Sequence, residues 1–379
     1  MSWPTAPTPK TVLGYHRILS PSAAVRVSPL CLGAMNFGDA WKQMMGECDK
    51  ETSFKIMDKF YDAGGNFIDT ANNYQNEESE EWVGEWMKSR GVRDEIVLAT
   101  KYTTDLKMGK GGMKSNYTGN HAKSLHISVE ASLKKLQTDY IDILYVHWWD
   151  HTTSVPEVMR SLNQLVLSGK VLYLGISDTP AWIVSKANEY ARAHGMAPFV
   201  VYQGLWSASV RDFEREILPM CEAEQMGIAP WGALGRGNYK TEAQREATKG
   251  EGRNMGGPSE TDLKVSKALE PIANRKKSTI ISVALAYIMH KYPYCYPIVG
   301  GRKVEHLEGN IEALSLELSE DDIKEIESAY PFEPGFPHGF LFRGVPWSSN
   351  LTGKDVFLTK VAAHIDTVSK VAPIKPRQQ

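Results

Sequence analysis

The stretch from Gly65 to Lys101, GNFIDTANNYQNEESEEWVGEWMKSRGVRDEIVLATK, contains one complete unit of the fold. It begins with a short apolar run at Phe67 to Asp69, continues with an amphipathic segment at Glu77 to Arg90, and ends with a second apolar run at Ile96 to Thr100. Short apolar runs indicate buried strands, whereas the longer amphipathic segment indicates a helix. Gly91 follows the helix, where a left-handed residue commonly terminates one. The stretch therefore predicts a strand, a helix and a second strand.

The same alternation continues on both sides of this stretch, so that eight predicted strands are each followed by a predicted helix. Eight such units in one chain favour an α/β fold of the (β/α)8 type, a TIM barrel of parallel strands inside a ring of helices. The predicted strands are Leu30 to Gly33, Phe67 to Asp69, Ile96 to Thr100, Ile141 to His147, Val171 to Ile176, Phe199 to Tyr202, Ile228 to Trp231 and Pro297 to Val299. The predicted helices are Lys50 to Ala63, Glu77 to Arg90, His121 to Gln137, Val155 to Ser168, Ala181 to His194, Phe213 to Met226, Thr261 to Asn274 with Ile281 to His290, and Val304 to Leu314.

A doubly wound nucleotide-binding sheet is the alternative architecture for such a repeat. Its glycine fingerprint follows the first strand. Here the first predicted strand leads into Ala34-Met35-Asn36-Phe37-Gly38, which lacks that fingerprint, so the barrel is favoured.

We expect one domain over residues 1–379, with the barrel at about 25–316 and a C-terminal loop and helical extension at about 317–379. In this extension, Glu320 to Tyr330 predicts a helix with Ser319 as its N-cap. Pro331 to Asn350 is a loop rich in Pro, Gly and aromatic residues, which we expect to cover an active site because long loops are usually functional. Val356 to Val371 predicts a final packing helix.

Composition favours a small molecule as the partner. The 379 residues are 42% hydrophobic and 23% charged, which is ordinary globular composition. The formal net charge is −2 and the basic residues form no long cluster, which argues against nucleic acid and acidic membranes as partners.

The cysteine pattern and the N-terminus favour a reducing compartment. Only four cysteines occur, without a Cys-x-x-Cys pair, so neither a disulfide framework nor a metal site is expected. The Pro-rich stretch Met1 to Lys10 has no apolar core of a signal peptide, and no run of about 18 apolar residues suggests a membrane span. We therefore expect a cytoplasmic protein.

Ionisable side chains occupy the ends of successive predicted strands. Asp69 ends the second, Lys101 the third and His147 the fourth, and Tyr74 lies in the loop after Asp69. Reactive groups of (β/α)8 enzymes lie at the carboxyl ends of the strands. Each of these residues alone is more often structural, but their joint placement favours a site that gives a proton to an oxygen or takes one from it.

Tyrosine is the natural proton donor of this set. Its ordinary pKa of about 10 is too high for a good acid at neutrality, but an ammonium about 4 Å away can lower it by roughly three units. We expect Lys101 to lower the pKa of Tyr74 in this way. Asp69 would hold Lys101 in place and keep it protonated, and His147 would hydrogen-bond the substrate oxygen.

The segments GNFIDTANNY and IVLATK and the strand that ends in His147 resemble the active-site signatures of the aldo-keto reductase superfamily, over about Val25 to Leu316. The resemblance implies Tyr74 as general acid, Lys101 as its activator, His147 as the residue that positions the carbonyl, and Asp69 as the partner of Lys101. Because this set contains no hydride source, a nicotinamide cofactor is required.

The resemblance also implies where NADPH binds. Ser177, Asp178 and Gln203 match positions that bind the carboxamide, and Trp231 matches the aromatic that stacks on the nicotinamide. WGALGRGNYK resembles the loop over the pyrophosphate, and VGGRKVEHLEGN leads into a helix N-terminus that suits the adenosine phosphate. The residues so implied are Asp69, Ser177, Asp178, Gln203, Trp231, Gly232, Ala233, Leu234, Gly235, Arg236, Gly237, Lys240, Gly301, Arg302, Lys303, His306 and Asn310.

The chain departs from the commonest pattern of the superfamily at three of these positions. His306 stands where many relatives have an arginine for the 2′-phosphate, Gly309 replaces a glutamate, and Asp178 replaces an asparagine. Arg302 and Lys303 can still meet a 2′-phosphate, so NADPH is favoured over NADH.

More narrowly, the lead HRILSPSAAVRVSPLCLGAMNFGDAW and the segment GISDTPAW resemble fungal aryl-alcohol dehydrogenases and norsolorinic acid reductase-like enzymes of polyketide pathways. This resemblance implies an aromatic aldehyde or an aryl ketone as substrate. Trp148 is the expected substrate contact beside His147. The full set of candidate aromatic residues at the mouth is Trp148, Trp149, Trp206, Phe336, Phe340, Phe342 and Trp347.

Two other functions stay open on the sequence. One is a redox-sensing regulatory subunit that resembles the potassium-channel β subunits and holds NADPH with little turnover. The other is a barrel aldolase with Lys101 as a Schiff-base lysine, which leaves the cofactor segments unexplained. The physiological substrate, the direction of the reaction and the choice between a monomer and a homo-oligomer are not determined by the sequence.

Overall fold

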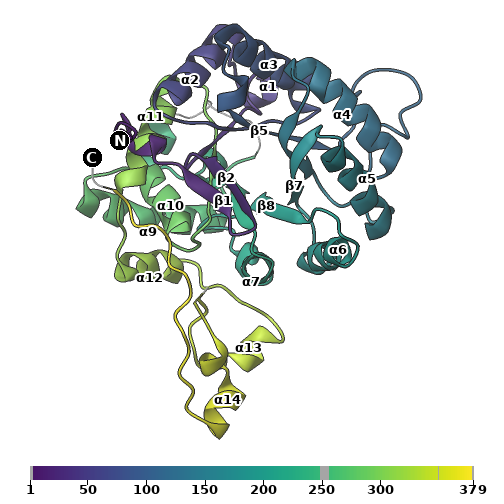
Figure 1. Ribbon diagram of the computed structural model, residues 1–379. Coiled ribbons are helices and arrows are strands. Elements are labelled where there is room, and N and C mark those ends of the chain that lie inside the picture. The colour runs from purple at the N-terminus through teal and green to yellow at the C-terminus, as the bar shows by residue number, and fades with distance from the viewer. Residues whose placement is uncertain (1–2, 248–255, 349, 378–379) are drawn as a thin grey trace.

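The computed structural model describes residues 3–247, 256–348 and 350–377, and its centre is a parallel β-barrel surrounded by helices (Figure 1). Within these residues, eight parallel strands lie side by side in the order β10-β3-β4-β5-β6-β7-β8-β9. The predicted α/β (β/α)8 barrel is confirmed. Its strands are β3 (Cys31–Gly33), β4 (Phe67–Asp69), β5 (Val97–Tyr102), β6 (Ile141–Val146), β7 (Val171–Ser177), β8 (Phe199–Leu205), β9 (Gly227–Trp231) and β10 (Ile298–Val299).

Backbone hydrogen bonds of Ile228 complete the ring between β9 and the segment that precedes β10. Its N–H donates to the carbonyl of Tyr294, and its own carbonyl accepts from the N–H of Tyr296, both at 2.9 Å. Because all strands run in parallel, their carboxyl ends meet at one rim. Residues that end neighbouring strands are therefore brought together there.

Except for α7, the connecting helices begin and end close to their predicted bounds. They are α2 (Lys50–Asp62), α3 (Glu78–Arg90), α4 (Ala122–Leu136), α5 (Val155–Leu167), α6 (Ala181–Ala193), α7 (Ile217–Ala223), α9 (Glu260–Lys276), α10 (Ile280–Met289), α11 (Val304–Glu312) and α12 (Glu320–Ser328). The short helices α1 (Lys42–Met45), α8 (Glu242–Ala247), α13 (His338–Leu341) and α14 (Phe357–Ala362) were not predicted with these bounds. Single 3-10 turns are η1 (Val12–Gly14), η2 (Tyr74–Glu77), η3 (Arg93–Glu95), η4 (Asp212–Glu214), η5 (Gly235–Gly237), η6 (Ala313–Ser315) and η7 (Gly353–Asp355).

Helix α7 is shorter than the predicted span of Phe213 to Met226. Pro219 is the reason, because in a helix that began at Phe213 its ring would clash with the carbonyl of Arg215. The helix instead starts at Ile217, which places Pro219 in the first turn, where its missing N–H has no helical partner to lose.

A β-hairpin that the sequence did not predict closes the amino-terminal end of the barrel. Strands β1 (Arg17–Ser20) and β2 (Ala23–Val27) pair antiparallel. Leu19 and Val27 are buried against barrel residues that include Phe67 and Tyr145. The two strands are too short to show a clear alternation of apolar and polar residues. Their side chains are buried only because they cover the end of the barrel.

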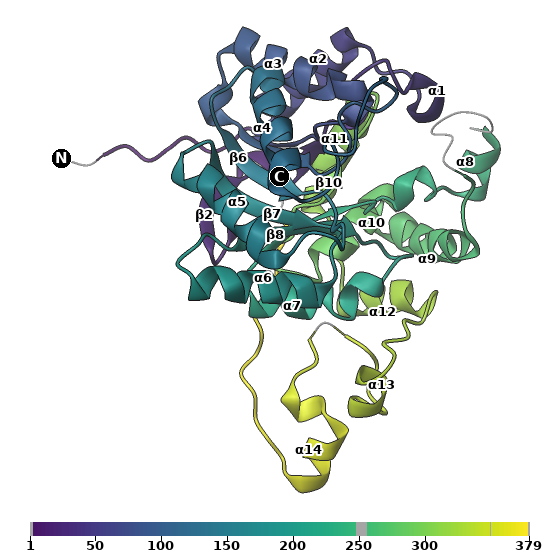
Figure 2. The ribbon, with the colours of Figure 1, turned by 90° about the vertical axis from the view of Figure 1, so that its right-hand side faces the viewer.

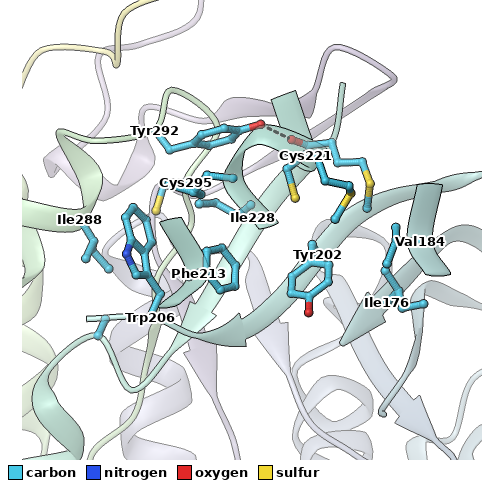
Figure 3. Packing of buried hydrophobic residues seen from close by; sticks show 14 of the residues in the cluster. Ile176, Val184, Tyr202, Trp206, Phe213, Cys221, Ile228, Ile288, Tyr292 and Cys295 are labelled. Carbon is cyan, nitrogen blue, oxygen red and sulfur yellow. Dashed lines mark hydrogen bonds between the residues drawn. The ribbon is translucent and has the colours of Figure 1, made fainter. Parts of the chain in front are cut away.

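The main core fills the layer between the strands and the outer helices, as Figure 3 shows for one part of it. Trp206 stacks on Phe213 with ring centroids 5.6 Å apart, and the hydroxyl of Tyr292 donates to the carbonyl of Met226 at 2.8 Å. Burial of this apolar layer holds each helix against its strand.

The C-terminal extension projects from the side of the barrel near α7 and α12 and returns along it (Figures 1 and 2). Ser319 caps α12 as predicted. The expected helix Val356 to Val371 is wrong beyond α14, because residues 363–377 contain no helix. Hydrogen bonds and ion pairs hold the extension against the barrel. For example, Arg215 donates a hydrogen bond to the carbonyl of Pro334 in the extension (3.0 Å), and Lys370 of the extension forms an ion pair with Glu222 (2.7 Å).

The extension is thus placed at the side of the barrel, and the expectation that Pro331 to Asn350 covers the active site is wrong. Ser349, within that range, lies outside the described residues. In the part of the chain that the structure describes, no helix is long and apolar enough to cross a membrane.

Candidate active site

The four ionisable residues predicted from the strand ends lie together at the carboxyl rim of the barrel. Lys101 Nζ lies 2.6 Å from Asp69 Oδ2 and 3.4 Å from the hydroxyl of Tyr74. The rings of Tyr74 and His147 meet edge to face with centroids 5.8 Å apart. Neighbouring parallel strands supply three of these residues, which is why the sequence order translates into contact.

A buried ion pair forms the base of the site. Lys101 is completely buried and also donates to the carbonyl of Thr70 at 2.7 Å. The other carboxylate oxygen of Asp69 accepts from Gln203 Nε2 at 2.9 Å. Burial alone would lower the pKa of Lys101, but Asp69 and Tyr74 outweigh that effect and raise it, so the ammonium stays charged.

The pKa of Tyr74 differs from the sequence expectation. Burial raises it, and the opposing effect of the Lys101 ammonium is smaller, so the net shift is upward from the ordinary value. The expected net lowering is therefore wrong for the chain by itself, because the sequence argument included the ammonium but not the desolvation of the phenol. Lys101 still favours the ionised form relative to a site without the ammonium.

His147 is held as a neutral imidazole. Burial, followed by the Lys101 charge, lowers its pKa well below the ordinary value. Its Nδ1 lies 3.2 Å from Thr104 Oγ1, and that hydroxyl accepts a hydrogen bond from Trp148 Nε1 at 3.0 Å. A neutral imidazole can donate one hydrogen bond to a substrate oxygen without giving up a proton.

The loop that carries Tyr74 has an unusual backbone. The three residues after the tyrosine, Gln75, Asn76 and Glu77, have φ values of 53°, 53° and 91°. Such left-handed runs persist only where the surroundings fix them. Gln75 Nε2 donates to the carbonyl of Met35 (2.9 Å), and Glu77 pairs with Lys110 (2.6 Å).

Trp41 is a residue of this site that sequence reasoning missed. Its ring meets that of Tyr74 edge to face with centroids 6.2 Å apart, and its Nε1 donates to Asn76 Oδ1 at 3.0 Å. Trp41 precedes α1 in the loop after β3. It ends the segment that resembles fungal aryl-alcohol dehydrogenases, but neither periodicity nor chemistry gave it a role at the site. Thr104, in the loop after β5, was also missed, because no motif or periodicity marked it.

Asp178, Ser177 and Trp231 lie together at the ends of β7 and β9. Trp231 Nε1 and Ser177 Oγ each donate to the Asp178 carboxylate at 3.3 Å. The backbone of Asp178 is left-handed, with φ 40°. Although the residue is exposed at the open rim, desolvation by the surrounding walls raises its pKa to about 6.

The segment after Trp231 has an unusual backbone. Gly232, Gly235, Arg236 and Gly237 have positive φ values of 74°, 66°, 57° and 91°. Left-handed glycines allow the backbone to approach a ligand closely, because they carry no side chain. The predicted segment Gly232, Ala233, Leu234, Gly235, Arg236, Gly237 and Lys240 contains these residues.

The N-terminus of α11 carries the second group of predicted cofactor residues. Lys303 is its N-cap and makes no side-chain capping hydrogen bond, so the first N–H groups are available to an anion. Arg302 lies over Gly46, where an added Cβ would come within 1.9 Å of its Nη1. Arg302 and these N–H groups have the chemistry to bind a phosphate group. Of the other predicted residues, Gly301, Lys303 and His306 belong to the same segment, whereas Asn310 is buried further along α11.

Of the candidate aromatic residues, only Trp148 is placed beside the four ionisable groups. Trp149 and Trp206 are core residues, 8% and 0% exposed, and are wrong as mouth residues. Phe336, Phe340, Phe342 and Trp347 belong to the extension at the side of the barrel and are also wrong. Aromatic residues occur both in cores and around active sites, so their presence in the sequence does not predict which of the two they form.

Comparison with known proteins agrees with this geometry. The chain is 59% identical to norsolorinic acid reductase A of Aspergillus parasiticus, over 100% of this chain and 97% of that protein. It is 59% identical to norsolorinic acid reductase B of Dothistroma septosporum (96% and 95%) and 49% identical to an aryl-alcohol dehydrogenase [NADP(+)] of Phanerodontia chrysosporium (99% and 99%). The model of the aldo/keto reductase family matches residues 29–331, and the chain therefore belongs to the aldo/keto reductase family.

Proposed function

We propose that this protein, an NADP-dependent oxidoreductase by its family, reduces an aromatic aldehyde or aryl ketone to the alcohol, with Tyr74 as the proton donor. The observation that carries the proposal is the 3.4 Å contact between the Tyr74 hydroxyl and a fully buried, charged Lys101. An ammonium so placed stabilises the tyrosinate that forms when the proton leaves.

The side chains have separate tasks in this proposal. When bound, NADPH supplies the hydride, so that carbonyl, NADPH and one proton give alcohol and NADP+. Tyr74 delivers the proton to the carbonyl oxygen and recovers it afterwards from solvent. His147 donates a hydrogen bond to the same oxygen, and Asp69 keeps Lys101 charged and oriented.

The cofactor is proposed to lie across the rim. Asp178 and Ser177 would bind the carboxamide, Trp231 would stack on the ring, the loop from Gly232 to Gly237 would bind the pyrophosphate, and Arg302 with Lys303 would bind the 2′-phosphate. In support, the Gly-rich loop has left-handed glycines that allow a close approach of the backbone to a ligand, and the α11 N-terminus lacks a side-chain cap. Gln203 supports Asp69 in this arrangement.

The aromatic substrate class rests on two observations. Trp41 contacts the Tyr74 ring, and Trp148 is bonded to the same threonine hydroxyl as His147, so a planar substrate would meet aromatic side chains beside the proton donor. Relatives at 49% to 59% identity are named as norsolorinic acid reductases and an aryl-alcohol dehydrogenase.

The test follows NADPH oxidation by absorbance with a panel of substituted benzaldehydes and aryl ketones, repeated with NADH. We expect turnover that prefers NADPH and falls by a factor of roughly 10² or more in Tyr74→Phe. Tyr61→Phe is the matched control, because the Tyr61 hydroxyl bonds Glu95 on the outer surface (2.7 Å). Tight NADPH binding without turnover of any carbonyl would replace the proposal with the regulatory-subunit alternative.

A further inference from the structure

Thr104 joins the two residues of the rim that are proposed to meet the substrate. Its hydroxyl oxygen lies 3.0 Å from Trp148 Nε1 and 3.2 Å from His147 Nδ1. An indole N–H is a donor only, so Thr104 must accept from Trp148. One lone pair of the hydroxyl is then used, and its single hydrogen is left for another acceptor.

The acceptor of that remaining hydrogen determines which nitrogen of the neutral His147 ring carries the proton. If Nδ1 carried the imidazole proton, it would point at Thr104, and the threonine hydrogen would need a different acceptor. Among the residues that the structure describes, only His147 is in place to accept a hydrogen bond from this hydroxyl. If instead Thr104 donates to Nδ1, both the hydroxyl hydrogen and Nδ1 have a partner, and the imidazole proton sits on Nε2.

The position of Thr104 is fixed from two directions. Asn72, from the Tyr74 loop, donates its Nδ2 hydrogen to the carbonyl of Thr104 at 2.9 Å. The preceding residue, Thr103, has φ 97°, which is rare for a β-branched residue and is held by Asn120 Nδ2 on its hydroxyl at 3.0 Å. A strained turn after β5 thus points the Thr104 hydroxyl back to the rim.

We propose that Thr104 is a positioning residue for the reductase reaction, one that holds neutral His147 in the tautomer with its proton on Nε2. The inference deepens the proposed function and rests on it for its catalytic consequence. With the proton on Nε2, His147 donates to the carbonyl oxygen beside Tyr74. With the proton on Nδ1, it would present a lone pair to that oxygen and repel it.

The direct test is the tautomer itself, read from the ¹⁵N resonances of His147 in protein labelled at histidine nitrogens and assigned with His147→Gln. In the wild type we expect a pyridine-type Nδ1 and a pyrrole-type Nε2–H. Thr104→Val keeps the shape but removes the hydroxyl, and we expect a mixture of tautomers. Thr104→Ser restores a hydroxyl and should restore the single tautomer.

Kinetics provide the second readout. In Thr104→Val we expect kcat/KM for a benzaldehyde to fall about tenfold, the size expected for one hydrogen bond, with partial recovery in Thr104→Ser. Thr152→Val, the same exchange at an exposed residue in the loop after β6, should leave both readouts unchanged.

A Nδ1–H tautomer in the wild type, or an unchanged Nε2–H tautomer in Thr104→Val, would overturn the inference. The NMR result requires no turnover, so it separates the two proposals. Absence of carbonyl reduction in the wild type would defeat the proposed function, whereas the tautomer assignment would stand or fall by the spectra alone.

Discussion

Lys101 Nζ lies 3.4 Å from the hydroxyl of Tyr74, at the end of a lysine side chain that is completely buried. Its other partners are Asp69 and the carbonyl of Thr70, so the ammonium is fixed on one side and faces the phenol on the other. Because burial raises the pKa of Tyr74, this ammonium is what limits the cost of forming tyrosinate.

Replacement of Lys101 by methionine should therefore impair the proton step. We expect kcat to fall by a factor of roughly 10² to 10⁴, the range for loss of general acid catalysis. NADPH affinity, measured by fluorescence quenching, should change little. Lys134→Met, at an exposed position on α4, is the control. A kcat within a factor of about three of the wild type would contradict the role.

Arg302 should discriminate between the two nicotinamide cofactors. It lies over Gly46 beside the uncapped N-terminus of α11, where we propose the 2′-phosphate binds. Loss of a charge-assisted hydrogen bond costs about 1.5 to 3 kcal/mol, so Arg302→Ala should weaken NADPH binding tenfold or more and leave NADH binding almost unchanged. If titration calorimetry shows that NADPH and NADH binding weaken equally, Arg302 does not contact the 2′-phosphate.

Asp178 should make cofactor binding depend on pH. Its pKa is raised to about 6, so the carboxyl is neutral below that pH and charged above it. The oxidised nicotinamide ring is cationic and the reduced ring is neutral, so a charged Asp178 favours NADP+ alone. From pH 5 to pH 7.5 we expect the affinity for NADP+ relative to NADPH to rise by about fivefold, equivalent to about 1 kcal/mol.

The Asp178→Asn variant tests the origin of this pH dependence, because asparagine cannot titrate in that range. The ratio of the two dissociation constants should become flat between pH 5 and pH 7.5. Persistence of the full pH dependence in the variant would assign it to another group.

We expect Glu214 to contribute to the stability of the fold and not to the catalytic reaction. It is 1% exposed and pairs with Arg211 and Lys291, each at 2.8 Å. Burial opposes its charge, yet the two cations hold its pKa below the ordinary value. Glu214→Gln leaves two buried cations with less compensation, and the free energy of unfolding in urea should fall by about 3 kcal/mol.

Asp212→Asn is the control for that change, because Asp212 pairs with Arg215 in solvent, with 75% of its side chain exposed. A surface pair of this kind contributes about 0 to 1 kcal/mol. Equal losses of unfolding free energy in the two variants would show that the buried ion pairs of Glu214 stabilise the protein no more than a surface pair does.

The fold was predictable because its signal is local. The apolar run at Phe67 to Asp69 and the glycine after α3 mark their elements without reference to the rest of the chain. The hairpin of β1 and β2 was not predictable in this way, since the burial of Leu19 depends on the barrel end that it covers.

The sequence by itself determined the (β/α)8 barrel and the meeting of Asp69, Lys101, Tyr74 and His147, because in a parallel barrel the residues that end successive strands must share one rim. Only the tertiary structure decided the direction of the Tyr74 pKa shift, the places of Trp41 and Thr104 at the rim, and the position of the C-terminal extension beside the barrel. The desolvation of a side chain, its ring contacts and its hydrogen-bond partners depend on residues that are far apart in the chain. A local sequence pattern therefore does not predict them.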